Sequence, residues 1–355
     1  VDTSKEIDPI NPGTVTIRGT IADYDKSSTT GMLYYFDGLA RENKSALVSI
    51  DSTGSFITSF TLAHQTSTIY LFLGKYGIHL TARPNKEYEI QVSKDGPVFM
   101  GEDGELNNQL NKVLIALQDT FREDNQLRNQ YSDSDSIGFE TYYDFCMDLA
   151  RRKLIFLDEF CNENQILEEA RLLTEQNIKY EPAWALIVFR SITHDGRWYK
   201  RENTPKDLVD RLRKEFPINN PTAIASRSYH DYLTNILDIM REEVIASEAY
   251  IETLKASGKF TEDEISIWKG IFSYDGVTYV TKEFQDLIRD KGDIQEKLFR
   301  EDNLKKMFEY SSTLPKWLGR DFIVSQGVMR DYFEIPLLEI SASEWEIISS
   351  LLSNQ

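Results

Sequence analysis

The spacing of hydrophobic residues changes once along this chain, and that change fixes the class of fold. From Thr14 to Val92 hydrophobic residues alternate with polar ones, as at Val15, Ile17 and Ile21. A period of two is typical of strands with one buried face, and the β-branched and aromatic residues that strands prefer dominate here. Beyond Gly104 the period becomes helical, because one face collects Leu106, Leu110, Val113, Leu114, Leu117 and Phe121. The sequence therefore predicts an α+β protein with its strands first.

Turn-forming residues divide the first part into six or seven strands. Polar or glycine-rich stretches at 23–31, 51–54 and 74–77 interrupt the alternation. So many short strands suit a small antiparallel sheet. We expect an N-terminal antiparallel β-sandwich-like domain over residues 1–100.

Helices are predicted for most of the remainder, residues 101–355, as a larger all-α domain. Start signals include a capping-box pattern from Thr261 to Glu264, and prolines at the first helical positions, Pro182 and Pro205. The predicted spans are 105–130, 138–162, 164–177, 182–194, 205–215, 222–246, 248–257, 261–271, 281–289, 293–309 and 341–352.

The charge distribution narrows the range of partners. The chain holds 58 acidic and 40 basic residues, a formal net charge of −18. Residues 1–100 carry 11 acidic and 9 basic side chains, so a net −16 falls on residues 101–355. Such acidity repels phosphate backbones, so we expect no nucleic-acid partner. No apolar run approaches twenty residues, so no transmembrane segment is predicted.

The two cysteines are predicted to be packing residues. Cys146 and Cys161 lie fifteen residues apart on one predicted helix. At about 1.5 Å per residue they are roughly 22 Å apart. A disulfide needs Cα atoms within about 7 Å. Without a Cys-x-x-Cys pair, the chain is not expected to perform redox chemistry itself.

One loop resembles a calcium site but departs from it. Residues 133–138 place Asp133 and Asp135 before Gly138, as in EF-hand loops. Ile137 stands where an oxygen ligand is needed, and Asp144 replaces the bidentate glutamate. We interpret the segment as a polar connector, and no metal ligands are predicted.

Other catalytic patterns are weak, so no catalytic residue and no cofactor is predicted. Nucleophile-elbow and phosphate-binding glycine motifs are missing, and His194 reads as part of a turn. Acidic pairs arise by chance on solvated helices of so acidic a chain. Two such acidic pairs are Asp238 with Glu242 and Glu262 with Glu264. The histidines, at 64, 79, 194 and 230, are too far apart in the sequence to form a metal-binding pair on one helix.

Trp198 and Tyr199 are the candidate partner-binding residues. They follow Gly196 in a polar, basic stretch that is predicted to be a loop. Exposed aromatics often anchor a partner, although burial is the commoner fate. The other aromatic groups, 34–36 and Trp184 with Phe189, are expected in cores.

The β-region resembles the N-terminal β-domain that precedes the thioredoxin-like domain in exported Bacteroidetes-type thiol:disulfide oxidoreductases. The resemblance lies in its layout: Val15-x-Ile17-x-Gly19, then 49–56, then 69–73, then the closing Pro84-x-x-x-Tyr88-x-Ile90. Asn107 and Asn108 before a long helix resemble that family's passage into a helical region.

The resemblance implies a setting rather than a reaction. The family's chemistry belongs to a C-terminal thioredoxin-like domain with a Trp-Cys-x-x-Cys motif, which this sequence lacks. It implies the periplasm or cell envelope, a signal sequence before Val1, and either a redox domain after Gln355 or its loss.

We therefore expect a non-catalytic binding or positioning region of an envelope thioredoxin-like oxidoreductase. Its partner would be a protein or peptide, such as the thioredoxin-like domain, met at sheet edges or loop tips. The alternative is a small-ligand receptor or hydrolase with a pocket between helices.

Overall fold

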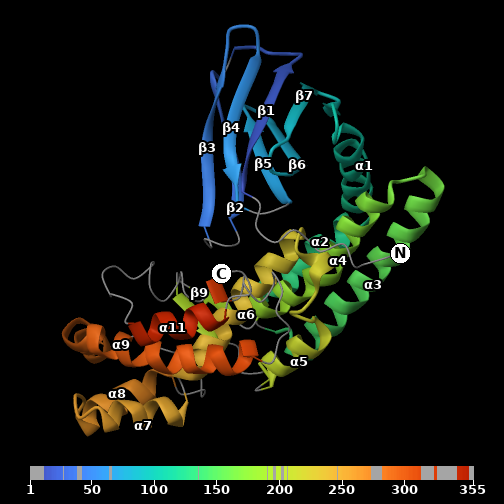
Figure 1. The fold of residues 1–355 in the computed structure, drawn as a ribbon. Coiled ribbons are helices and arrows are strands. Elements are labelled where there is room, and N and C mark those ends of the chain that lie inside the picture. The colour runs from blue at the N-terminus through green and yellow to red at the C-terminus, as the bar shows by residue number, and fades with distance from the viewer. Residues whose placement is uncertain are drawn as a thin grey trace. The chain divides into compact units, whose positions relative to one another are not determined.

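A computed structural model gives the fold, and Figure 1 shows its elements. It describes residues 12–26, 28–37, 42–63, 66–134, 136–189, 191–194, 197–200, 204–205, 207–245, 247–272, 282–312, 324–325 and 342–351. Two compact units share the chain. Unit 1 comprises 1–126, 147–182 and 220–231, and unit 2 comprises 127–146, 183–219 and 232–355.

Unit 1 contains one sheet of eight strands, in the order β6-β5-β2-β3-β4-β1-β7-β8. All neighbours are antiparallel except β1 and β7, which run parallel from the pair Thr16–Glu87 to the pair Ile21–Val92. The strands are β1 Gly13–Ile21, β2 Thr30–Asp37, β3 Glu42–Ile50, β4 Ser55–Leu62, β5 Ser67–Leu73, β6 Tyr76–Ala82, β7 Glu87–Ser93 and β8 Gly96–Met100.

The expected sandwich is wrong, because the strands form a nearly closed, barrel-like sheet (Figure 1). A curled sheet buries the same alternate residues as two stacked sheets, so the hydrophobic pattern cannot separate the two folds. The purely antiparallel pairing is wrong as well. Strand β1 links strands β2–β6 to the hairpin of β7 and β8, since it pairs with β4 on one side and with β7 on the other.

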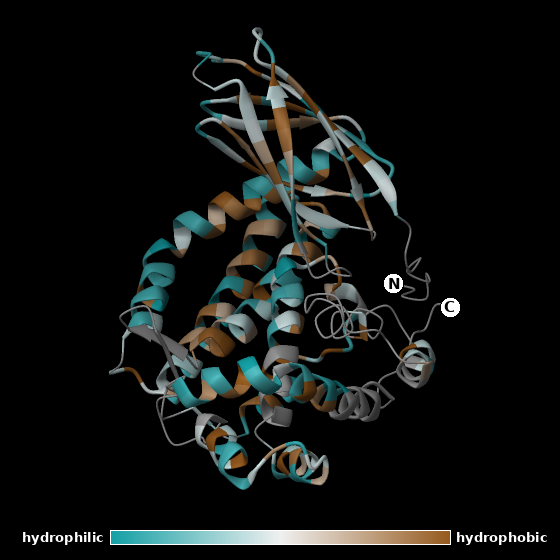
Figure 2. Cartoon of the chain, turned by 90° about the vertical axis from the view of Figure 1, so that its left-hand side faces the viewer, coloured by the Kyte–Doolittle hydropathy of each residue, from teal (hydrophilic) through white to brown (hydrophobic). Residues whose placement is uncertain are grey.

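The core of the sheet is formed by the inward residues of every strand. Val15, Ile17, Leu33, Ile69 and Ile90 are fully buried in one hydrophobic cluster. In Figure 2, hydrophobic residues recur along the strands between hydrophilic ones. Strand β8 was not predicted, because Pro97 and its neighbouring glycines read as a loop.

The helices begin close to the predicted positions but divide differently. Pro182 lies inside one long helix instead of opening a new one. The predicted capping box is confirmed, since Thr261 N donates to Glu264 Oε2 at 2.7 Å. They are α1 Gly104–Thr120, α2 Arg122–Asp133, α3 Phe139–Asn164, α4 Glu168–Phe189, α5 Leu208–Glu215, α6 Arg227–Ile245, α7 Glu248–Ala256, α8 Glu262–Phe272, α9 Lys282–Ser312 and α11 Ala342–Leu351, with a 3-10 turn at Pro221–Ala223.

The part after residue 100 is not all helical. A two-stranded ribbon joins β9 Ser191–His194 to β10 Arg197–Lys200. Within the described residues, no helix combines the length and the apolar character needed to cross a bilayer.

Partly buried ion pairs tie the helices of unit 1 together. Arg152 forms a two-point contact with Asp124, at 2.8 and 3.0 Å. The Lys153 ammonium is buried and donates to Glu181 Oε2 at 2.8 Å and to Asn125 Oδ1 at 3.1 Å. Contacts between charged groups shielded from water are stronger than surface pairs. They hold α2, α3 and α4 in fixed register.

Unit 2 has its own aromatic packing. The rings of Tyr142 and Phe189 stack 4.1 Å apart. A separate cluster packs Tyr250, Trp268 and Phe299, and the Tyr250 hydroxyl donates to the carbonyl of Gln295 at 3.1 Å.

Candidate protein-interaction face

Three adjacent strands of the sheet present no charge on their outer side. Strands β5, β2 and β3 alternate inward and outward, so every second residue faces away from the core. More than a quarter of the whole chain is charged. The outward residues are nevertheless all uncharged: Thr68, Tyr70, Phe72, Thr30, Met32, Tyr34, Phe36, Asn43, Ser45, Leu47 and Ser49. We call these positions the uncharged face.

An apolar stripe crosses this face. Met32 on β2 lies opposite Phe72 on β5 and opposite Leu47 on β3. Ile57 on β4 continues the row, since it pairs with Ser49, two residues beyond Leu47. The ring of Tyr34 meets Phe72 edge to face at 5.8 Å. We call these five residues the apolar stripe.

The stripe is exposed to an unusual degree. Leu47 is 63% and Ile57 64% exposed, and Tyr34 and Phe72 exceed 40%. Single exposed apolar residues are normal on a protein surface, whereas contiguous ones mark contact sites. Four neighbouring strands contribute here, so the stripe is a contiguous patch.

The start of α6 covers the adjoining end of the uncharged face. The Arg227 guanidinium lies 4.8 Å from the Phe36 ring centre, and the His230 ring lies 6.2 Å from it. Next to Phe36, Tyr70 and His79 meet edge to face at 4.6 Å, and burial lowers the pKa of His79. This outer side therefore already packs against another part of unit 1, and the stripe is its uncovered continuation.

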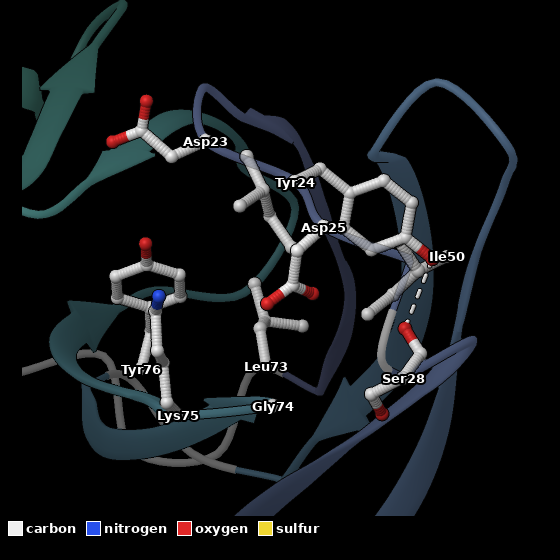
Figure 3. Close-up of a pocket in the computed structure, with 10 residues that line it drawn as sticks. Asp23, Tyr24, Asp25, Ser28, Ile50, Leu73, Gly74, Lys75 and Tyr76 are labelled. Atoms are coloured by element: carbon white, nitrogen blue, oxygen red, sulfur yellow. Dashed lines mark hydrogen bonds between the residues drawn. The ribbon is translucent and has the colours of Figure 1, made fainter.

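One end of the barrel carries a small hollow. Figure 3 shows Asp23, Asp25 and Tyr76 gathered around it, with Lys75 at its rim. The loop after β1 is fixed by Tyr24, whose hydroxyl donates to the carbonyl of Ser28 at 3.0 Å. The other lining residues are Ile21, Ile50, Leu73 and Gly74.

The chemistry of the hollow is limited by its size. Its volume is about 20 Å³, and a single water molecule needs about 10–15 Å³ measured in the same way. The Tyr76 hydroxyl is buried without a hydrogen-bond partner among the described residues. Lys75 lies 5.3 Å from the centre of the Tyr76 ring. The hollow can hold a water molecule but not an organic ligand.

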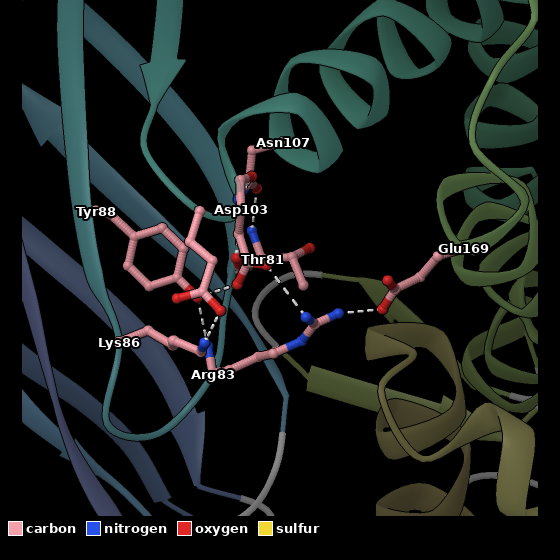
Figure 4. A network of polar contacts seen from close by, with 8 residues as sticks. Thr81, Arg83, Lys86, Tyr88, Asp103, Asn107 and Glu169 are labelled. Atoms are coloured by element: carbon pink, nitrogen blue, oxygen red, sulfur yellow. Dashed lines mark hydrogen bonds and ion pairs between the residues drawn. The ribbon is translucent and has the colours of Figure 1, made fainter.

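Helix α1 closes the two edges of the sheet with asparagine side chains. Asn107 accepts from Thr81 N at 2.7 Å and donates to Thr81 O at 3.0 Å (Figure 4). Its neighbour Asn108 makes the same pair of bonds with Phe99, at 2.9 and 2.8 Å. A side-chain amide thus replaces a missing strand at β6 and at β8.

Few other backbone N–H and carbonyl groups point away from the sheet along the open edges of β6 and β8. On β8, Pro97 lies two residues before Phe99, so its backbone points to the same open edge. Proline has no N–H to donate there. On β6, Asn111 donates to the carbonyl of His79 at 3.1 Å. An incoming strand would need alternate free donors and acceptors along an edge. Partner binding by strand addition, which the sequence suggested, is therefore disfavoured at β6 and at β8. Strand β3 differs from them, because it pairs with β4 only at Ser49 and Ile50.

A polar network holds α1 in this position. Asp103, at the start of α1, accepts from Tyr88 Oη and from Arg83 Nη1, each at 3.1 Å (Figure 4). Arg83 also pairs with Glu169 of α4, and its own backbone N–H donates to Tyr88 Oη at 2.8 Å. Burial raises the pKa of the Tyr88 hydroxyl, so it stays protonated as a donor.

The predicted partner-binding residues occupy a strand instead of a polar loop. Trp198 and Tyr199 belong to β10, where they pair with Thr193 and Ile192 of β9. Their side chains lie outside the described residues, so the binding role remains a prediction. His194, expected in a turn, is the last residue of β9.

Both cysteines are buried thiols, as the helical spacing predicts. Cys146 and Cys161 both lie on α3, each at most 4% exposed. Burial raises the pKa of the Cys161 thiol, which disfavours the reactive thiolate.

The other motifs have structural explanations where the structure describes them. Glu264 caps α8 and pairs with Lys291 at 2.6 Å, so its carboxylate is already engaged. Ser134 and Ser136 are hydrogen bonded at 2.9 Å in the calcium-like segment, while Asp135 lies outside the described residues. The side chains of Asp238 and Glu242 lie outside them too.

The apolar stripe was missed by sequence reasoning. Tyr34 was expected in a core together with Tyr35, but Tyr35 is buried and Tyr34 is exposed. Inside a strand, Leu47 and Val48 look alike, although one faces water and the other the core. The useful signal was the lack of Lys, Arg, Asp and Glu at alternate positions of β2, β3 and β5.

Comparison with known proteins adds no assignment. No protein-family model, curated protein or solved structure matches the chain.

Proposed function

We propose that this chain is a non-catalytic binding and positioning region that meets a protein partner through its uncharged face. The observation that carries the proposal is the apolar stripe. It exposes large side chains from four adjacent strands of a chain that is otherwise strongly acidic. Aromatic residues and methionine, such as Tyr34, Phe72 and Met32 here, are enriched at protein interfaces.

Neither the hollow nor the two thiols offers a catalytic centre. The hollow at the end of the barrel has room for a water molecule, and both thiols are buried. Enzyme sites usually bury most of their ligand in a pocket of several hundred Å³.

The resemblance to envelope thiol:disulfide oxidoreductases supplies the wider proposal. In that setting the region would position a thioredoxin-like domain in the periplasm or cell envelope. The apolar stripe is a surface of side chains, and strand addition is disfavoured at β6 and β8, so the partner would be folded before it binds.

The test is binding by biolayer interferometry. The immobilised full chain is offered a separately expressed thioredoxin-like domain from an exported oxidoreductase, and in parallel an unfolded, carboxymethylated peptide. We expect the folded domain to bind, and Leu47→Lys to weaken it at least about tenfold by placing a charge in the contact. The control is Val98→Lys, which puts the same charge on β8 at a residue that is 50% exposed. If neither probe binds and the chain does not self-associate, the proposal fails.

A further inference from the structure

We infer that the partner which occupies the uncharged face is a second copy of this chain, paired face to face about a two-fold axis. The inference rests on the proposed function, because it concerns the same face. A second copy bound there would compete with the thioredoxin-like domain of the binding test. The inference also goes further, since a pair would position two attached domains at once.

The charge pattern favours a copy over a different protein. In a two-fold dimer, residues near the axis lie beside their own equivalents. An ionised side chain there would meet a like charge, which costs several kcal/mol. All eleven outward residues of β5, β2 and β3 are uncharged, so this face meets the requirement.

The neutrality ends where the stripe ends. On β1 and β7, the next strands beyond Ile57, the outward residues include Arg18, Glu87 and Glu89. These side chains are about half or more exposed. Charge is therefore admitted on the outer side of the same sheet, immediately beyond the stripe.

The net charge of the chain points the same way. A basic partner would be attracted by acidic surface and would gain nothing from an uncharged contact. A second copy carries the same net charge of −18, so a contact between two neutral surfaces adds no further repulsion between the chains. The apolar stripe is such a surface.

The shape of the contact is that of two stacked sheets. Sheets pack face to face about 10 Å apart with interdigitating side chains. Leu47 and Ile57 are the most exposed residues of the stripe, and the Tyr34–Phe72 pair adds two aromatic rings to it. Neither copy needs a free strand edge, which agrees with the asparagine closures at β6 and β8.

The test is sedimentation velocity of the full chain over a range of concentrations. We expect a concentration-dependent dimer that becomes tighter as salt is raised from about 50 to about 500 mM, because salt screens the repulsion between two acidic chains. An interface held by salt bridges would instead weaken. A wild-type chain that stays monomeric at every concentration overturns the inference.

Two substitutions locate the interface. Leu47→Lys and Ile57→Lys should each weaken the dimer at least about tenfold, since each new charge lies near its own copy. Val98→Lys should leave the dimer within about twofold of wild type. Both residues of the stripe are outward and exposed, and circular dichroism checks that each variant is folded. A dimer that both stripe variants leave intact overturns the inference.

The outcomes separate the inference from the function beneath it. If the chain is monomeric while Leu47→Lys abolishes binding of a thioredoxin-like domain, the proposed function stands and self-pairing falls. If the chain neither self-associates nor binds that domain, both fall.

Discussion

The side-chain amide of Asn107 binds the backbone of Thr81 as a neighbouring strand would, accepting from its N–H and donating to its carbonyl. Asn107 is fully buried, and the next residue, Asn108, does the same for Phe99 on the opposite edge. Two consecutive residues of one helix thus close both edges of an eight-stranded sheet.

Removal of this closure should destabilise unit 1. In Asn107→Ala, the N–H and carbonyl of Thr81 lose their partners, and an unsatisfied buried group costs about 1–3 kcal/mol. We expect a lower urea midpoint by circular dichroism and faster hydrogen exchange at the Thr81 amide. The control is Gln118→Ala, an exposed position on α1. Equal midpoints for the two variants would contradict the closure.

The Lys153–Glu181 pair should show strong coupling. Lys153→Met leaves the Glu181 carboxylate without its ammonium partner, and losing one member of a buried pair costs up to about 3–5 kcal/mol. Because Glu181 keeps 27% of its side chain exposed, we expect the lower part of that range.

The double variant Lys153→Met with Glu181→Leu is the informative comparison. It removes both charges, so urea denaturation should recover part of the lost stability. Additive losses in the double-mutant cycle would show that the two side chains do not interact.

Acid should weaken the Asp124–Arg152 contact. Hydrogen bonds from Arg152 lower the pKa of Asp124 in the folded protein. Its stabilisation is therefore complete above the unfolded-state pKa of about 3.9 and is lost as pH falls through the folded value. Wild type should exceed Asp124→Asn in urea midpoint at pH 7, and the gap should close near pH 2. Asp119→Asn, at an exposed pair, is the control.

His79 should lower the free energy of unfolding as pH falls from neutral to mildly acidic. Burial lowers its pKa, so the unfolded chain takes up the proton first as pH drops below about 6.5. Stability then falls until the folded His79 is also protonated. His79→Gln should remove this component from the difference between pH 7.5 and 5.5.

The facing groups define what else titrates near His79. Tyr70 lies against the His79 ring, and Arg227 and Asp231 lie near Tyr70. Burial raises the pKa of the Asp231 carboxyl. Asp231 acts in the opposite direction, since a raised acid pKa favours the folded state as pH falls. An NMR titration of the His79 ring that gives a pKa at or above 6.5 would rule out the predicted loss.

Both cysteines should resist modification in the native state. Cys146 and Cys161 are buried, so a thiol reagent should react slowly before unfolding and fully in urea. The isolated chain should also give no turnover in an insulin-reduction assay. Rapid native labelling, or absence of two thiols in urea, would contradict this account.

The sequence predicted the elements of this fold better than their arrangement. The alternation around Val15 and Ile17 identified β1 as a strand, but a strand's own pattern cannot specify that its two neighbours are β4 and β7. Pro182 shows a second limit, because it was read as the start of a new helix but lies inside α4. The cysteines were predicted well because helical geometry alone separates them.

The candidate face was harder to find for a related reason. Leu47 and Ile57 are hydrophobic like the core, and exposure depends on which side of the curled sheet a residue faces. The register of β2, β3 and β5 reveals that Met32, Leu47 and Phe72 form one row. No local signal in the chain specifies that row.

The position of β1 between β4 and β7 has a kinetic consequence. Its contacts reach 43 residues ahead to Ser59 and 71 residues ahead to Glu89. Chains dominated by such distant pairings fold slowly, because a long loop must be ordered before the contacts form. During synthesis, one flank of β1 therefore waits unprotected until β7 has been made, and nascent chains of this protein should be most prone to aggregate in that interval.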